Sequence, residues 1–136
     1  MKTLLSSLVC SLLLILAGCA TTPPITPQQI ASADYGASPQ DHEKMIRDYL
    51  FQTMIDPNSM MLDSMGEPFK AYDSLKKRWG YGVYFRLNGK NELGGYTGWQ
   101  QSVAFMRDEQ VLDVWEGITD RDGRMYGTIN FVRKVE

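Results

Sequence analysis

The amino-acid sequence predicts an α+β fold in which one N-terminal amphipathic helix packs on a four- or five-stranded antiparallel sheet. Apolar residues recur at helical spacing between residues 39 and 54, and apolar and polar residues alternate along several later segments. An apolar run and a proline-rich stretch come first, which indicates a signal peptide and a flexible tether before the folded part. A helix followed by alternating strands is typical of an antiparallel sheet with one covered face.

The helix is expected to begin at Ser38-Pro39, because a serine hydroxyl can cap the first turn and proline is tolerated at the first helical position. Asp41 adds negative charge at the positive end of the helix dipole. The predicted buried stripe comprises Met45, Ile46, Tyr49, Leu50 and Met54, and the solvated face carries Glu43, Lys44, Arg47 and Asp48. Asp56-Pro57 ends the helix, since a residue before proline avoids helical geometry.

The strands are expected after residue 58. Residues 59–65 form a weak first strand, and residues 69–78 form either a loop or an irregular strand with a helical turn at 74–78. The alternation is clear in residues 81–88, where Val83, Phe85 and Leu87 share one face and Tyr84 and Arg86 the other. Residues 99–105, 111–116 and 125–133 give the remaining strands.

The chain opens with the features of an export signal. Lys2 precedes an apolar run over residues 4–16, which is too short for a membrane-spanning helix of roughly 20 apolar residues. Leu16-Ala17-Gly18-Cys19 resembles the bacterial lipobox, in which a peptidase cleaves before a cysteine that carries a diacylglyceryl group. By this resemblance Cys19 is lipidated and becomes the first mature residue. The alternative is an ordinary secretory peptide with a cysteine nearby.

This resemblance divides the chain into a lipoprotein signal peptide (1–18), a lipidated cysteine with a proline-rich tether (19–37) and a globular α+β domain (38–136). The tether contains Pro23, Pro24 and Pro27, which favour an extended chain that reaches about 50 Å at roughly 3 Å per residue. Residues 28–33 could form a short helical turn. Ala20 follows the lipidated cysteine in place of the aspartate of inner-membrane retention signals, so an outer-membrane anchor facing the periplasm is favoured over the inner membrane.

Charge and cysteine content exclude some classes of partner and linkage. The chain has 14 Lys and Arg against 16 Asp and Glu; loss of Lys2 leaves 13 against 16, a net charge of −3. Because the two signs are interspersed and no basic stripe exists, a nucleic-acid partner is not expected. Cys10 lies inside the apolar run and is removed with it, so Cys19 alone remains and an intramolecular disulfide is excluded.

Several motifs in the mature chain resemble those of a group of small uncharacterised bacterial envelope proteins, many of them lipoproteins. They are Asp34-Tyr35-Gly36, Asp56-Pro57-Asn58-Ser59, Tyr81-Gly82, and Lys90-Asn91 followed by Gly94-Gly95-Tyr96-Thr97-Gly98. The resemblance covers nearly the whole mature domain. It implies an envelope location, and it brings no established activity, substrate or catalytic residue.

The most unusual mature stretch is residues 88–99, which contain four glycines together with Lys90, Asn91, Tyr96 and Trp99. One interpretation is a partner-binding loop in which Tyr96 and Trp99 supply flat apolar contacts and Lys90 and Asn91 fix polar groups. The other is a wide hairpin connection whose glycines adopt left-handed backbone conformations. The stretch is neither a P-loop nor a dinucleotide fingerprint, because it joins strand to strand.

Few residues in the sequence indicate metal binding or catalysis. Four methionines could offer sulfur ligands to Cu(I), but they are more typical of core filling: Met54, Met60, Met61 and Met65. A calcium loop is suggested by Asp120-Arg121-Asp122-Gly123, but this segment fits a hairpin turn better. His42 is the sole histidine, no Gly-x-Ser-x-Gly motif occurs, and lipid would block the Cys19 thiol. We therefore expect no metal, no cofactor and no enzymatic activity.

These observations favour a lipid-anchored, non-catalytic binding or accessory module in the periplasm. Its partners would be the membrane, through lipidated Cys19, and an envelope protein or a cell-wall component. The alternative is a periplasmic inhibitor or immunity-type protein directed at a cell-wall hydrolase, which would use residues 88–99 to fill the hydrolase cleft.

Overall fold

The computed structural model of this 136-residue chain describes residues 24–119, 125–126 and 132–135. In chain order the elements are α2 (Pro27–Ser32), α3 (His42–Thr53), the 3₁₀ turn η1 (Pro57–Ser59), β1 (Met61–Asp63), β2 (Phe69–Asp73), β3 (Arg78–Asn88), β4 (Gln100–Arg107), β5 (Gln110–Thr119), β6 (Met125–Tyr126) and β7 (Val132–Lys134). The α+β class expected from the sequence is confirmed.

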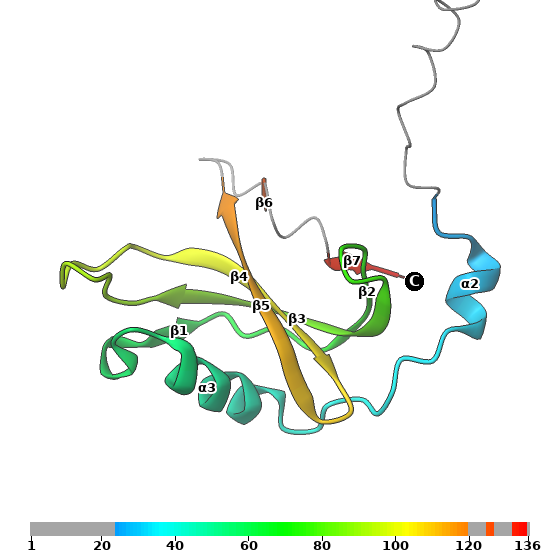
Figure 1. Ribbon diagram of the computed structural model, residues 1–136, viewed down its shortest axis with the longest axis horizontal. Coiled ribbons are helices and arrows are strands. Elements are labelled where there is room, and N and C mark those ends of the chain that lie inside the picture. The colour runs from blue at the N-terminus through cyan, green and yellow to red at the C-terminus, as the bar shows by residue number, and fades with distance from the viewer. Residues whose placement is uncertain (1–23, 120–124, 127–131, 136) are drawn as a thin grey trace, which may run out of the picture.

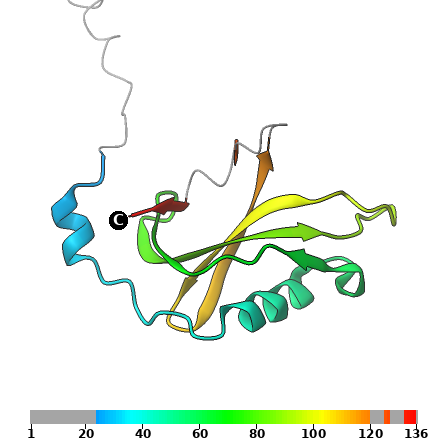
Figure 2. The ribbon, with the colours of Figure 1, turned by 180° about the vertical axis from the view of Figure 1, so that it is seen from behind.

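The strands form one antiparallel sheet with the order β6-β5-β4-β3-β2-β7, and β1 pairs with the far end of β3. Helix α3 lies along one face of this sheet (Figure 1), and the view from behind shows the same arrangement (Figure 2). Tight pairing of β3 with β4, for example Val83 opposite Ala104, sets which side chains face the helix.

The sheet buries an apolar cluster on each of its two faces. On the face covered by α3, Ile46 and Leu50 pack against Val83, Phe85, Leu87, Ala104 and Met106. On the opposite face, Ala71, Val103 and Phe105 are buried, with Phe69, Tyr84, Leu112 and Trp115 packed around them. The predicted alternation along β3 is therefore confirmed, and the side chain of Tyr84 packs into the second cluster.

Helix α3 differs from the prediction at both ends. It begins at His42, with Asp41 as the N-cap residue, so the expected start at Ser38-Pro39 is wrong. The preceding segment is held against the sheet instead, because the Ala37 N–H donates to Asp108 Oδ1 at 3.2 Å and Pro39 is buried. The helix ends at Thr53, where the Met54 N–H bonds the Leu50 carbonyl, and Pro57 then opens η1. The predicted stripe is confirmed, since Ile46 and Leu50 are buried and Met45, Tyr49 and Met54 pack against them.

Of the two alternatives for residues 69–78, the strand is confirmed over residues 69–73 and the loop is wrong. A tight turn at residues 74–77 replaces the expected helical turn. The Asp73 Oδ1 atom accepts hydrogen bonds from the Leu75 and Lys76 N–H groups, both at 3.1 Å, and this turn chemistry reverses the chain. Lys77 completes the reversal with a left-handed backbone (φ 52°). We call residues 74–77 the β2–β3 turn.

The strand expected over residues 125–133 is seen at its two ends, where Met125–Tyr126 pair with β5 and Val132–Lys134 pair with β2. Residues 127–131 lie outside the described part of the chain.

The segment just before α3 is fixed to the sheet by its own Tyr35 and by Arg107 of β4. Tyr35 is 7% exposed, its ring meets Trp79 edge-on at 5.6 Å, and its hydroxyl donates to the Ile30 carbonyl at 3.0 Å. Arg107 donates to the Asp34 carbonyl at 2.6 Å, to the Asp34 carboxylate at 2.7 Å and to the Trp79 carbonyl at 2.9 Å. We call residues 34–37 the strap. Folded contacts thus begin before the expected boundary at residue 38, and the expected helical turn at 28–33 is realised as α2.

Candidate functional site

The glycine-rich stretch after β3 is a structured hairpin connection. Lys90 and Tyr96 form an isolated antiparallel bridge, and the Thr97 N–H donates to the Gly89 carbonyl at 3.0 Å. Gly94 and Gly98 have left-handed backbones (φ 79° and 86°), which L side chains rarely adopt. The hairpin interpretation is confirmed in geometry. We call residues 88–99 the distal loop, because Figure 1 shows it at the end of the long axis opposite α2.

Two asparagines hold the distal loop in shape. Asn91 Oδ1 accepts hydrogen bonds from the Leu93 and Gly95 N–H groups at 3.0 and 3.1 Å, and Asn88 Oδ1 accepts one from the Gly98 N–H at 3.1 Å. Asn91 was expected to contact a ligand, but its side-chain carbonyl oxygen already accepts hydrogen bonds within the loop. Its amide nitrogen would be the group left for a partner.

The base of the distal loop is joined to the end of α3. The buried Ser59 hydroxyl accepts a hydrogen bond from the Lys90 N–H at 2.9 Å and donates one to the Asp56 carbonyl at 2.7 Å. At Gly89 an added Cβ would lie 2.5 Å from the Met54 methyl group, so glycine permits close packing there. The loop and the helix end consequently form one rigid wall.

Between this wall and the sheet lies a groove of about 460 Å³. Its apolar lining comes from Leu50, Met54, Ile55, Leu87 and Val114, its aromatic lining from Tyr49, and its polar lining from Thr53, Lys90, Asn91, Thr97, Gln100 and Glu116. Among the described lining residues, Lys90 and Glu116 are the charged ones. A concave surface that combines apolar and polar side chains is typical of a binding site.

The structure brings together two of the four predicted site residues. Lys90 and Asn91 line the groove, whereas Tyr96 and Trp99 do not. Tyr96, 50% exposed, lies under the Lys90 ammonium at 5.6 Å, and Trp99, 42% exposed, lies under the Arg86 guanidinium at 5.1 Å. One face of each aromatic ring is thus in contact with a cation of this chain.

The sequence reasoning missed the exposed apolar residues at the C-terminal end of α3. Phe51 is 57% exposed and Ile55, which lines the groove, is 68% exposed. Both are apolar residues outside the predicted buried stripe, and that mismatch was a usable signal. Exposed apolar residues beside a groove indicate a contact surface more strongly than isolated ones do.

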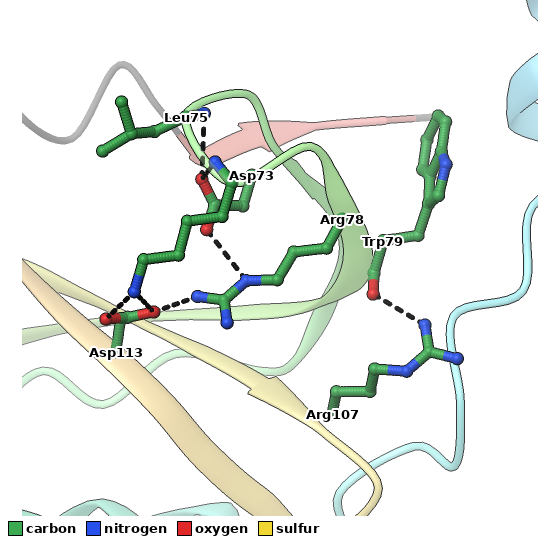
Figure 3. A network of polar contacts seen from close by, with 7 residues as sticks. Asp73, Leu75, Arg78, Trp79, Arg107 and Asp113 are labelled. Carbon is green, nitrogen blue, oxygen red and sulfur yellow. Dashed lines mark hydrogen bonds and ion pairs between the residues drawn. The ribbon is translucent and has the colours of Figure 1, made fainter.

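A polar network occupies the sheet face away from α3, near the β2–β3 turn (Figure 3). The fully buried carboxylate of Asp73 accepts from Arg78 Nε at 3.0 Å, and Asp113 accepts from Arg78 and from Lys76 Nζ at 2.7 Å. Burial raises the pKa of Asp113 and is the largest single influence, but the hydrogen bonds and charges of Lys76 and Arg78 together outweigh it and hold the pKa below its ordinary value of 3.8. Because the acids and bases are paired, the network is structural.

The strap contains a second perturbed carboxylate. The Gly36 N–H and then the Arg107 guanidinium hold the pKa of Asp34 below its ordinary value of 3.8. Burial, and then the neighbouring Tyr81, raise the pKa of the Tyr35 phenol. These shifts belong to an attachment of the chain and not to the groove.

The candidate metal residues are dispersed or packed. Met54, Met60 and Met65 contact the core cluster under α3, and Met61 is 40% exposed on β1. Within residues 24–119, 125–126 and 132–135, no three His, Cys, Asp or Glu side chains are placed to hold a metal ion. Residues 120–123, weighed as a calcium loop or a turn, and Cys19 both lie outside the described residues.

Comparisons of the chain with protein-family models, with curated proteins and with solved structures find no match. Among the described helices, none has the length and apolar character needed to cross a bilayer. The class that the fold and the groove define is an α+β domain with a candidate binding site at the end opposite α2. Function is therefore inferred from the groove, the distal loop and the N-terminal segment.

Proposed function

We propose that this chain is a lipid-anchored envelope protein that acts in the periplasm as a non-catalytic binding module, with its lipid on Cys19. The single observation that carries the binding role is the groove between α3, the distal loop and β5, with exposed Ile55 at its edge. The lipobox-like residues Leu16-Ala17-Gly18-Cys19 carry the location. Ala20 after the cysteine supports an outer-membrane anchor facing the periplasm over an inner-membrane anchor.

The chemistry of the groove favours a protein segment as the occupant. Five lining side chains are aliphatic or thioether groups, which bury well against apolar side chains of a partner. Lys90 and Glu116 lie among the lining residues and would orient a partner segment that carries both signs of charge.

The arrangement of the ends supports the same role. Figure 1 and Figure 2 both show α2 at one end of the long axis and the distal loop at the other. A chain anchored ahead of α2 would therefore present the groove away from its attachment. This is the geometry that a tethered accessory subunit needs to reach another envelope component.

The test is affinity capture of the full lipidated chain from envelope extract, compared with the Ile55→Asp variant and quantified by mass spectrometry. A charge in the groove should lower the recovery of a specific partner by at least about tenfold, because one unpaired carboxylate in an apolar interface costs more than about 1.4 kcal/mol of binding free energy. The matched control is Lys44→Asp on the solvated face of α3, where the exposed Lys44 pairs with Asp48. Equal recovery of every protein by the two variants would refute binding in the groove.

A second candidate function is supported by the exposed tip of the distal loop. Leu93 is 94% exposed at this tip, and such a projecting apolar side chain could enter the cleft of a cell-wall hydrolase. An inhibitor should form a one-to-one complex with the hydrolase and lower its rate, and Leu93→Asp should abolish both effects. An accessory module should leave hydrolase rates unchanged and lose its partner with Ile55→Asp instead.

A further inference from the structure

The N-terminal end of the described chain lines one side of a cavity whose other side is formed by the β2–β3 hairpin. Pro24 and Ile25 line a shallow cavity of about 640 Å³ together with Tyr72, Lys77 and Trp79 of that hairpin. The strap then fixes the following residues, since Tyr35 is buried against Trp79 and Arg107 holds Asp34. The chain therefore enters the folded domain beside the β2–β3 turn.

This entry point shortens the reach expected from the sequence. Only five peptide steps separate Cys19 from Pro24, and an extended chain spans at most about 3.6 Å per residue, or roughly 18 Å in total. The reach of about 50 Å predicted for an extended tether assumed a free chain up to residue 37. A lipid on Cys19 would thus hold the β2–β3 turn close to the bilayer surface.

The hairpin has the composition of a surface that lies on anionic lipid. The hairpin carries four basic residues near its turn, Lys70, Lys76, Lys77 and Arg78. Its one carboxylate, Asp73, is fully buried and bonded to Arg78. Asp113 of β5 neutralises one further charge through Lys76. The chain as a whole has a net charge of −2, so this local excess of positive charge runs against the average.

The turn also offers an apolar group beside these charges. Leu75 is 52% exposed, and the neighbouring Lys76 side chain is also exposed. Lysine side chains with an adjacent leucine suit the boundary between headgroups and acyl chains, because the ammonium group stays with the phosphates while the apolar part is buried.

We propose that the β2–β3 turn, through Leu75 and Lys77, contacts the anionic headgroups of the same bilayer that holds Cys19, and so orients the domain with its groove away from the lipid. This inference rests on the proposed function, because it takes Cys19 as the anchor. The attraction is electrostatic and therefore weakens as salt is added.

The test uses the full lipidated chain reconstituted in vesicles that contain phosphatidylglycerol, with a nitroxide quencher on the lipid headgroup. A fluorophore is placed on Leu75→Cys or on Leu93→Cys, two exposed leucines at the turn and at the distal loop. Quenching at position 75 should exceed quenching at position 93 by roughly twofold or more, and the excess should shrink in high salt or in vesicles of phosphatidylcholine alone.

Charge reversals complete the test. Lys77→Glu in the Leu75→Cys background should reduce the excess quenching, whereas Lys44→Glu, the same change on α3, should leave it unaltered. Equal quenching at the two positions on vesicles that carry the chain, or greater quenching at position 93, would overturn the proposed orientation while leaving the anchor intact. Failure of the chain to sediment with the vesicles would instead overturn the anchor at Cys19, and the orientation with it.

Discussion

Asp73 is the charged side chain whose burial has the clearest energetic consequence. Its carboxylate is completely inaccessible and accepts from two backbone N–H groups of the β2–β3 turn and from Arg78 Nε. The Arg78 guanidinium in turn lies 4.9 Å from the Phe105 ring centre, so it covers the apolar cluster on that face. One carboxylate therefore links the turn, β3 and the core.

Asp73→Ala should lower the free energy of unfolding by about 1–3 kcal/mol, because Arg78 Nε and two turn N–H groups lose their acceptor while the guanidinium keeps its bond to Asp113. Denaturant unfolding monitored by circular dichroism would measure this. The control is Asp48→Ala, an exposed partner of Lys44 on α3, which should change stability by less than about 1 kcal/mol. A loss for Asp73→Ala no larger than for the control would contradict the assignment.

Asp113 makes stability depend on pH in a defined direction. Its pKa in the folded chain is below the ordinary value of 3.8, so its ionised form stabilises the fold above that value and this contribution is lost as the pH falls through the folded pKa. The denaturant midpoint should therefore drop between about pH 5 and pH 3, and less steeply in Asp113→Asn. An identical pH dependence in the two chains would show that Asp113 is not held in its ionised form.

Glycines in β3 determine how closely the strands approach the apolar cluster on the open face. A Cβ added at Gly80 would lie 2.5 Å from the Met106 carbonyl oxygen and 2.7 Å from the Phe105 ring. The first neighbour is backbone and cannot rotate away. Gly80 is thus required by the packing of β3 against β4.

Gly80→Ala should destabilise the protein by about 1–3 kcal/mol through this overpacking. Gly95→Ala in the distal loop is the matched control, since its nearest neighbour would lie 3.8 Å away and its backbone is not left-handed. We expect the control to stay within about 0.5 kcal/mol of the unmodified chain. Thermal unfolding of both variants checks the difference, and equal melting temperatures would contradict the packing argument.

Periodic elements could be predicted from the sequence where one face of a regular element is buried. The stripe of α3 and the alternation in β3 follow directly from burial against a single core, and both were predicted correctly. The start of α3 could not be predicted, because Ser38 and Pro39 have local helix-start chemistry that is overridden by distant contacts such as Ala37 with Asp108. That residues 125–126 pair with β5 and residues 132–134 with β2 likewise depends on distant contacts.

The candidate site was predicted only in part for the same reason. Lys90 and Asn91 line the groove as expected, but the sequence does not reveal that Asn91 is engaged by its own loop or that Ile55 faces the groove. Those facts depend on how the end of α3 meets the distal loop through Ser59 and Gly89. Such contacts join residues 31 positions apart and leave no local pattern.

Taken together, the strap, the sheet and the groove describe a domain with two distinct ends. Its N-terminal segment is fixed beside a basic turn, and its groove lies with the distal loop at the other end of the long axis (Figure 1). Both the proposed location and the proposed orientation require that the chain is attached to lipid ahead of residue 24. The attachment is therefore the claim on which the account depends.

The most direct measurement is metabolic labelling with palmitate together with membrane fractionation of the unmodified chain and of Cys19→Ser. We predict that the unmodified chain carries label and sediments with the outer membrane, and that Cys19→Ser loses the label and leaves that fraction, since removal of the acylated thiol removes the buried acyl chains. Palmitate labelling and membrane recovery that persist in Cys19→Ser would contradict the account.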